Sequence, residues 1–133
     1  MRNSNYENQV HPTITLELQA LERWCNGDPN GFIEISSENV VYHDPFIKDK
    51  LIGIEEIKRH YKKIEGKIFA QSFLMLGPVL HQFNSVAILT YKLESIIDDN
   101  KIMSWICTEV YQQSTEKGWI ILHSHWSMIN DNN

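Results

Sequence analysis

Hydrophobic residues recur with a helical period in the first half of the chain and alternate with polar residues in the second half. The pattern predicts a first helix that begins at Pro12-Thr13 and ends at Asn26-Gly27, since glycine commonly follows the last helical turn. A short second helix is predicted over residues 29–36 and a third over 53–65. The residues predicted to face the core are Ile14, Leu18, Leu21 and Cys25 in the first helix, and Ile54, Ile57, Tyr61 and Ile64 in the third.

Runs of apolar residues, many of them alternating with polar ones, predict the strands. The predicted strands cover residues 40–44, 67–76, 79–95, 101–114 and 119–129. Pro45 stops the first, a bulge is expected near His81-Gln82, and Gly118 supplies the permissive angle of a final hairpin. Helices followed by antiparallel strands are typical of the α+β class. We expect a strongly curved antiparallel sheet that wraps the long helix in a cone shape.

The size and charge of the chain indicate one folded domain of residues 12–130 after a disordered lead-in of residues 1–11. The chain has 133 residues, of which 42% are hydrophobic, enough for one core. The net charge of −5 disfavours a nucleic-acid partner. No apolar run approaches the ~20 residues that span a bilayer, and the polar start does not resemble a signal peptide. A cytoplasmic protein without a membrane partner is expected.

Polar side chains occupy the apolar side of the last two predicted strands. Glu109 shares a face with Trp105 and Cys107, and Ser124 shares a face with Trp126. A carboxylate on an apolar face is costly unless that face lines a cavity. The alternative is an alternation displaced by one residue, which would turn Glu109 toward water. The shared face favours the inward orientation, so the sequence predicts a pocket beneath the sheet.

Four stretches of the chain carry a family resemblance. They are the helix end Ala20–Asp28, the strand Val40–Pro45, the helix Gly53–Tyr61 and the strand Gly118–Ser127. Together they resemble the nuclear-transport-factor-2-like superfamily, also called SnoaL-like or cystatin-like, over residues 14–129. The His-Ser-His-Trp-Ser ending is similar to the association domain of calcium/calmodulin-dependent kinase II, and the Tyr-His-Asp-Pro strand to ketosteroid isomerases and polyketide cyclases. The superfamily hosts enzymes, binding modules and oligomerisation domains, so the resemblance implies a fold more firmly than an activity.

The resemblance to ketosteroid isomerases implies catalytic roles for three residues. Asp44 matches the carboxylate base that moves a proton beside a carbonyl group, and Glu109 matches an inward acid that donates to an oxyanion. Tyr42 lies on the same face as Asp44 and is placed to donate to a substrate oxygen. A turn in which Asp44 bonds its own backbone is the alternative explanation of the Asp-Pro pair.

Two positions depart from the patterns of these families. The oxyanion tyrosine of the isomerases matches Ala20, which has no donor, so Tyr42, Tyr61 or Trp24 would have to replace it. In the kinase association domains, an inward arginine matches Glu109. Relative to those association domains, the charge of the pocket is then reversed, and an acidic ligand is disfavoured.

The last predicted strand carries two histidines that share a face, His123 and His125. They have no third ligand nearby in sequence, so a metal site is not predicted. We expect them on the outer face of the sheet, in a homodimer interface. The face opposite to theirs is predicted to carry Ile120, Leu122, Ser124, Trp126 and Met128. The single histidines His43, His60 and His81 have no predicted role.

Cofactor and metal motifs are absent from the sequence. There is no phosphate loop, nucleophile elbow or paired His-Glu zinc motif, so no cofactor and no metal are expected. Cys25 and Cys107 match no metal or redox spacing. Buried free thiols are expected, with a disulfide as the alternative.

Two functions remain open on the sequence alone. The first is binding of a small, largely apolar molecule, with or without cofactor-free isomerisation or dehydration in which Asp44 is the base and Glu109 or Tyr42 stabilises charge. The second is a non-catalytic association module that acts through the outer face of the sheet. The residues predicted to line the pocket, besides the three catalytic candidates, are Trp24, Tyr61, Trp105, Ser124 and Trp126.

Overall fold

The computed structural model describes residues 10–129 of the chain. Its helices are α2 (Pro12–Cys25), α3 (Asn30–Glu34) and α4 (Ile54–Lys62). Its strands are β1 (Ser36–His43), β2 (Leu51–Ile52), β3 (Ser72–Phe83), β4 (Val86–Asp98), β5 (Lys101–Ser114) and β6 (Gly118–Met128). None of the helices within 10–129 is long and apolar enough to cross a membrane.

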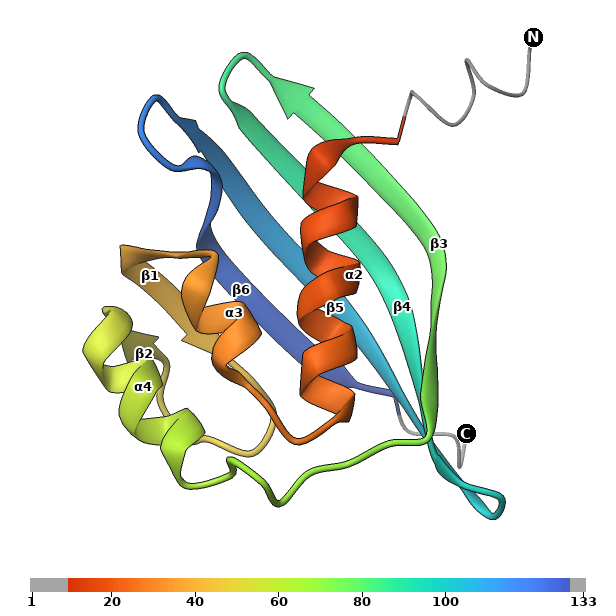
Figure 1. Cartoon of the computed structure of the whole chain (residues 1–133). Coiled ribbons are helices and arrows are strands. Elements are labelled where there is room, and N and C mark those ends of the chain that lie inside the picture. Colours follow the sequence, from red (N-terminus) through yellow and green to blue (C-terminus); the bar gives the residue numbers. More distant parts are fainter. Residues whose placement is uncertain (1–9, 130–133) are drawn as a thin grey trace, which may run out of the picture.

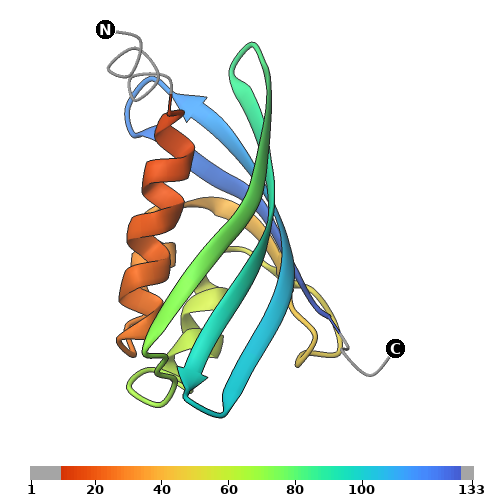
Figure 2. The same ribbon diagram turned by 90° about the vertical axis from the view of Figure 1, so that its right-hand side faces the viewer.

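The strands form a single six-stranded sheet in the order β2-β1-β6-β5-β4-β3. Every pair is antiparallel except β1 with β6, which is parallel. The sheet is twisted and strongly bent, and α2, α3 and α4 lie on its concave side (Figures 1 and 2). No described segment covers its convex face. The predicted α+β architecture is confirmed, with one parallel pair where an antiparallel sheet was expected.

Both ends of α2 carry recognisable caps. His11 is the N-cap, and its Nδ1 accepts from the backbone N–H of Thr13 at 3.2 Å. The predicted lead-in therefore overlaps the described chain at its last two residues, whereas residues 1–9 lie outside the described part. At the C-terminal end, the backbone N–H groups of Gly27 and Asp28 donate to the carbonyls of Trp24 and Arg23. This is the Schellman arrangement, for which the positive φ of 84° at Gly27 is required.

The predicted apolar stripe of α2 is partly wrong. Leu18 is 38% exposed, whereas the fully buried positions include Thr13 and Glu17 as well as Leu21. The helix is rotated so that a carboxyl group, rather than a leucine, faces the sheet. The reason lies in β4 and β5, which offer hydroxyl donors to that carboxyl group, as described below.

The predicted strand over 79–95 is also wrong, because it contains a hairpin turn. Strands β3 and β4 pair up to Phe83 and Val86, which leaves Asn84-Ser85 as a two-residue loop. Asn84 adopts a positive φ of 55°, a conformation that asparagine tolerates well. The register shift in β3 lies between Leu76 and Val79 rather than near His81-Gln82.

A second register shift changes which residues of β6 face the core. Tyr111 pairs with Ile121 and Val110 with His123, so Leu122 is an extra residue between them. Trp119 and Ile121 are therefore buried before the shift, and Ser124 is buried after it. The prediction of which residues of β6 face the core is correct for Ser124 and wrong for Ile120 and Leu122. The reason is that a bulge interrupts the simple alternation of side chains.

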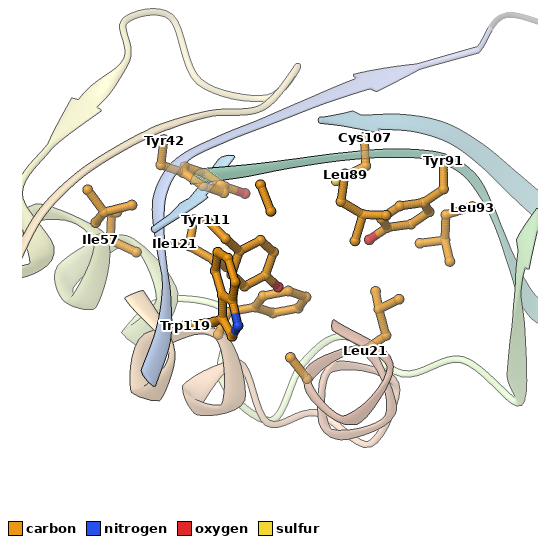
Figure 3. Packing of buried hydrophobic residues seen from close by; sticks show 14 of the residues in the cluster. Leu21, Tyr42, Ile57, Leu89, Tyr91, Leu93, Cys107, Tyr111, Trp119 and Ile121 are labelled. Atoms are coloured by element: carbon orange, nitrogen blue, oxygen red, sulfur yellow. The ribbon is translucent and has the colours of Figure 1, made fainter. Parts of the chain in front are cut away.

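The core lies between α2 and the concave face of the sheet. Figure 3 shows the rings of Tyr91 and Tyr111 inside this layer, on the side where α2 places Leu21. Ile121 of β6 and Leu89 of β4 belong to the same cluster. Both cysteines are buried and free, as the default interpretation of the sequence predicted.

Candidate active site

A cavity of about 370 Å³ opens between the helices and one end of the sheet. This volume falls within the range of pockets that hold small organic molecules. Its wall is largely apolar and includes seven aromatic residues. Rings in it meet edge to face, with centroids 5.4 Å apart for Trp24 and Tyr61 and 6.2 Å apart for Trp105 and Trp126. The aromatic residues of the lining are Trp24, Phe32, Tyr42, Phe46, Tyr61, Trp105 and Trp126.

Asp44 is the carboxyl group of this lining, and it lies directly after β1. Its Oδ2 accepts from the hydroxyl of Tyr42 at 2.7 Å, and its Oδ1 accepts from the backbone N–H of Phe46 at 2.8 Å. The second contact is the turn that the sequence offered as an alternative role. The turn therefore holds the carboxyl group against the cavity, and the catalytic role of Asp44 stays a prediction.

His60 joins this group from α4, 16 residues further along the chain. Its Nε2 lies 3.4 Å from Oδ2 of Asp44, and its side chain is 20% exposed. Sequence reasoning assigned His60 no role because the residue stands alone in a charged helix. The contact arises only because α4 packs beside β1, a non-local arrangement that the local pattern does not contain.

The two tyrosines of the site are neutral hydrogen-bond donors. Burial raises the pKa of Tyr42 well above its ordinary value, and the neighbouring Tyr61 and Asp44 raise it further. Burial likewise raises the pKa of Tyr61. Tyr42 is already engaged with Asp44, whereas Tyr61 lies across from it with ring centroids 5.5 Å apart. The cavity thus combines a fixed carboxyl group, an imidazole and phenol groups in apolar surroundings.

Glu109 and Ser124 point inward as predicted, but neither belongs to the cavity lining. Ser124 accepts from the indole Nε1 of Trp126 at 3.1 Å and so holds that ring against the cavity. Glu109 is fully buried deeper in the core, with Ser124 and Leu89 as its cross-strand partners. The other predicted pocket residues, Trp24, Tyr61, Trp105 and Trp126, lie in the lining together with Tyr42 and Asp44.

A second carboxyl group, Glu17 of α2, is buried beside Glu109. Its Oε2 accepts from the hydroxyl of Tyr91 at 2.5 Å, and its Oε1 accepts from the hydroxyl of Tyr111. Within the described residues, neither oxygen of Glu109 has a hydrogen-bond partner. Sequence reasoning missed Glu17 because a charged residue in an amphipathic helix is ordinarily placed on the solvent side.

These two carboxyl groups share a closed environment that favours protonation. Burial, with the charge of Glu17 as the second cause, raises the pKa of Glu109 well above its ordinary value. Burial also raises the pKa of Glu17, although the donors from Tyr111 and Tyr91 oppose the rise. Glu17 is surrounded by donors and Glu109 has none, so Glu109 is the member that holds a proton. Burying two like charges side by side would otherwise be prohibitive.

Metal-ligating side chains also gather in this buried cluster. One atom each of Glu17, Cys107 and Glu109 lies within 4.8 Å of the other two. All three residues are completely buried, and burial also raises the pKa of the Cys107 thiol well above its ordinary value. A cation would have to displace those protons and lose its hydration shell inside a closed core, so we assign no metal site to this cluster.

The convex face carries the histidines that the sequence placed on the outer side. His123 and His125 are exposed, and His43 of β1 lies beside them. Partial burial, with the charge of His125 as the second cause, lowers the pKa of His123. Their role in a homodimer interface stays a prediction.

Solved structures of similar shape support the resemblance found in the sequence. A protein from Parabacteroides distasonis, provisionally named ketosteroid isomerase, is 35% identical, with a TM-score of 0.81 over 91% of this chain and 88% of that one. An NTF2-like protein of unknown function from Pseudomonas putida is 17% identical, with a TM-score of 0.77 over 91% and 87% of the two chains. The CaMKII hub of S. rosetta is 17% identical, with a TM-score of 0.71 over 90% and 98%.

No protein-family model and no curated protein matches the chain. The match to the Parabacteroides protein nevertheless covers most of both chains at an identity well above that of the other two. The chain belongs to the nuclear-transport-factor-2-like superfamily, among its ketosteroid isomerase-like proteins, and has the cystatin-like fold. The two matches at 17% identity support the fold alone.

Proposed function

We propose that the chain binds a small, largely apolar carbonyl compound in the aromatic cavity and moves a proton within it, with Asp44 as the base and without a cofactor. The single observation that carries the proposal is the position of Asp44. Its carboxyl group is held by Tyr42 and by its own turn at the wall of a largely apolar hollow. A carboxyl group placed beside a carbon atom of a bound ketone has the reach that proton abstraction requires.

The proposed step is proton transfer next to the carbonyl group. Asp44 takes the proton, the electron pair of the C–H bond moves toward the carbonyl oxygen, and return of the proton at a second carbon completes an isomerisation. The negative charge on oxygen needs a donor, and Glu109 lies outside the lining. Tyr61 takes this role in our proposal, because it lines the cavity and burial keeps its hydroxyl neutral.

His60 completes the proposed site as a positioning residue. Its ring nitrogen lies 3.4 Å from Asp44, on the partly exposed side of the carboxyl group. In this position it holds the carboxyl group in place and offers a route by which protons exchange with water.

The experiment that tests the proposal measures exchange of carbon-bound hydrogen. A panel of small apolar ketones, including β,γ-unsaturated ones, is incubated with the protein in D2O and followed by NMR. We expect deuterium to enter next to the carbonyl group faster than in buffer for at least one ketone that binds. Binding without any accelerated exchange would contradict the catalytic part of the proposal.

A second candidate function, association of two copies through the convex face, is supported by exposed apolar side chains. Four of these side chains lie on β3 and β5, with exposed fractions between 37% and 56%. We call them the outer apolar patch. Their partners on β4, Lys92, Glu94 and Ile96, place them on one face of the sheet, on either side of that strand. An exposed group of this kind commonly marks an interaction surface. The patch consists of Leu74, Leu76, Ile102 and Ile106.

Ile106→Glu is expected to dissociate the proposed homodimer. A carboxylate buried in the proposed interface costs about 2 kcal/mol or more, which weakens association about thirtyfold. Analytical ultracentrifugation over a range of concentrations measures the shift. The control is Leu18→Glu, since Leu18 is also exposed but lies on α2. A native chain that remains a monomer throughout would contradict this second function.

A further inference from the structure

One polar residue of the cavity lining stands apart from the others. Ser95 of β4 is buried, with an exposed fraction of 8%, and lines the cavity in a row with Leu93 and Ile97. Residues two apart on a strand share a face, so these three side chains point the same way. The direct partners of Ser95 on β3 and β5 are Phe73 and Met103. The hydroxyl of Ser95 therefore meets the cavity from an apolar stretch of its wall.

The other hydroxyl and carboxyl groups of the lining form a separate group around Asp44. Tyr42 and His60 contact its carboxyl group at 2.7 and 3.4 Å, and Ser95 takes part in neither contact. The ring of Tyr61 lies 5.5 Å from that of Tyr42. The cavity thus offers hydrogen-bonding side chains at two positions, one around Asp44 and one at Ser95.

The width of the sheet separates these two positions. Asp44 directly follows β1, whereas Ser95 lies on β4, and β6 and β5 run between those strands (Figure 1). Neighbouring strands are about 4.8 Å apart, so the three steps across the sheet amount to about 14 Å along its curve. Figure 3 shows Tyr42 and Leu93, which accompany the two positions, on opposite sides of the layer. The wall between the positions consists largely of aromatic side chains of β6 and β5.

The hydroxyl of Ser95 needs a hydrogen-bond partner in these surroundings. Burying a hydroxyl group without one is unfavourable, and the side chains of Phe73 and Met103 offer no strong one. Water in the cavity, or a bound ligand, is able to supply the partner. A ligand that is apolar at this end would displace the water and leave the hydroxyl unpaired, so the cavity discriminates against such a ligand.

We propose that Ser95 determines specificity by binding a second polar group of the ligand, at the end of its apolar body that is remote from the carbonyl group. The inference rests on the proposed function, since it takes the carbonyl group to lie beside Asp44. A serine hydroxyl both donates and accepts, so it pairs equally with a hydroxyl group or a second carbonyl oxygen. The proposed substrate class is thereby narrowed to ketones with an extended apolar body and an oxygen function at the far end.

The test compares two ketones that differ only in a remote hydroxyl group, 4-acetyl-4′-hydroxybiphenyl and 4-acetylbiphenyl. Their dissociation constants are measured by calorimetric titration of the native protein and of Ser95→Ala. We expect the preference for the hydroxylated ketone to fall about tenfold in the variant, the contribution of one hydrogen bond. Because each protein is compared with itself, the different solubilities of the two ketones cancel.

Two controls accompany this comparison. Ser104→Ala is the matched variant, since Ser104 is a buried serine of β5 outside the lining, and it is expected to keep the native preference. The shorter pair 4-hydroxyacetophenone and acetophenone tests the distance. Its hydroxyl group lies too close to the carbonyl group to reach Ser95, so Ser95→Ala is expected to leave the preference within this pair unchanged.

The possible failures of this inference and of the proposed function are distinguishable. If the biphenyl ketones bind and their preference is the same in the native protein and in Ser95→Ala, Ser95 does not contact the ligand and the inference is wrong, while the proposed function stands. If no ketone binds the native protein, the proposed function is wrong and this inference falls with it. Binding of 4-acetylbiphenyl by Ser95→Ala shows that the variant is folded.

Discussion

Asp44→Asn is expected to lower the rate of deuterium exchange into a bound ketone by about 10²–10⁴-fold, the usual contribution of a general base. Asparagine has the same shape but only one acceptor oxygen. That oxygen still accepts from the backbone N–H of Phe46, so the turn after β1 is retained, whereas the hydroxyl of Tyr42 loses its acceptor. An amide is too weak a base to take a proton from carbon. Binding of the ketone, measured by tryptophan fluorescence, is expected to change little.

The control for this variant is Asp49→Asn, because Asp49 is an exposed aspartate of the same loop, outside the cavity lining. It is expected to exchange ketone hydrogens at the native rate. Equal exchange rates in the native protein and in Asp44→Asn would show that Asp44 takes no part in the reaction. A loss of binding together with exchange would instead show that Asp44 holds the ligand.

Glu109→Gln is expected to make the protein progressively more stable than the native chain as the pH rises. Burial and the charge of Glu17 raise the pKa of Glu109 well above its ordinary value, so the folded state keeps a proton that the unfolded state has released. The stabilisation that this proton contributes is fully present below the pKa of Glu109 in the unfolded chain. It is lost as the pH rises toward the pKa of Glu109 in the folded chain. The loss is ~1.4 kcal/mol per pH unit for one proton.

Glutamine has the shape of the protonated acid and never ionises, so the variant does not lose stability in this way as the pH rises. Urea unfolding of both proteins between pH 4 and pH 8 (about the range in which an ordinary glutamate is ionised) measures the difference. Glu116→Gln is the control, since Glu116 is exposed in the turn before β6. Stability curves that stay parallel over this range would contradict the assignment of the proton to Glu109.

Glu17→Gln distinguishes the two members of the pair. Both oxygens of Glu17 accept hydrogen bonds from the hydroxyls of Tyr91 and Tyr111, and an amide offers only one acceptor oxygen. We therefore expect this variant to lose about 1–3 kcal/mol of stability, because one buried hydroxyl is left unpaired. A variant as stable as the native protein would show that Glu17 is not the acceptor of the cluster.

The parts of the fold that depend on local patterns were predictable from the sequence. The β5–β6 hairpin follows from two alternating runs separated by a turn, and the inward orientation of Glu109 follows from its apolar neighbours on β5. The aromatic lining was found largely through the family resemblance together with the alternation. The loop Asn84-Ser85 was missed because its residues are moderate turn formers within a long apolar stretch.

The parts that were missed depend on contacts between distant segments. Glu17 is buried because Tyr91 and Tyr111 offer hydroxyl donors from β4 and β5, which the sequence of α2 does not reveal. His60 reaches Asp44 only through the packing of α4 beside β1. The bulge at Leu122 reverses the alternation halfway along β6, so a register argument fails there by one residue.

The most direct test of the proposed cavity is an NMR titration of the tryptophan indole N–H signals with a small apolar ketone. The chain has four tryptophans, and three of them, Trp24, Trp105 and Trp126, line the cavity. Trp119 is buried elsewhere, against His11 at the start of α2. Our account predicts that the three signals move together with one affinity while the signal of Trp119 stays in place. Movement of Trp119 alone, or no movement with any ketone of the panel, would contradict it.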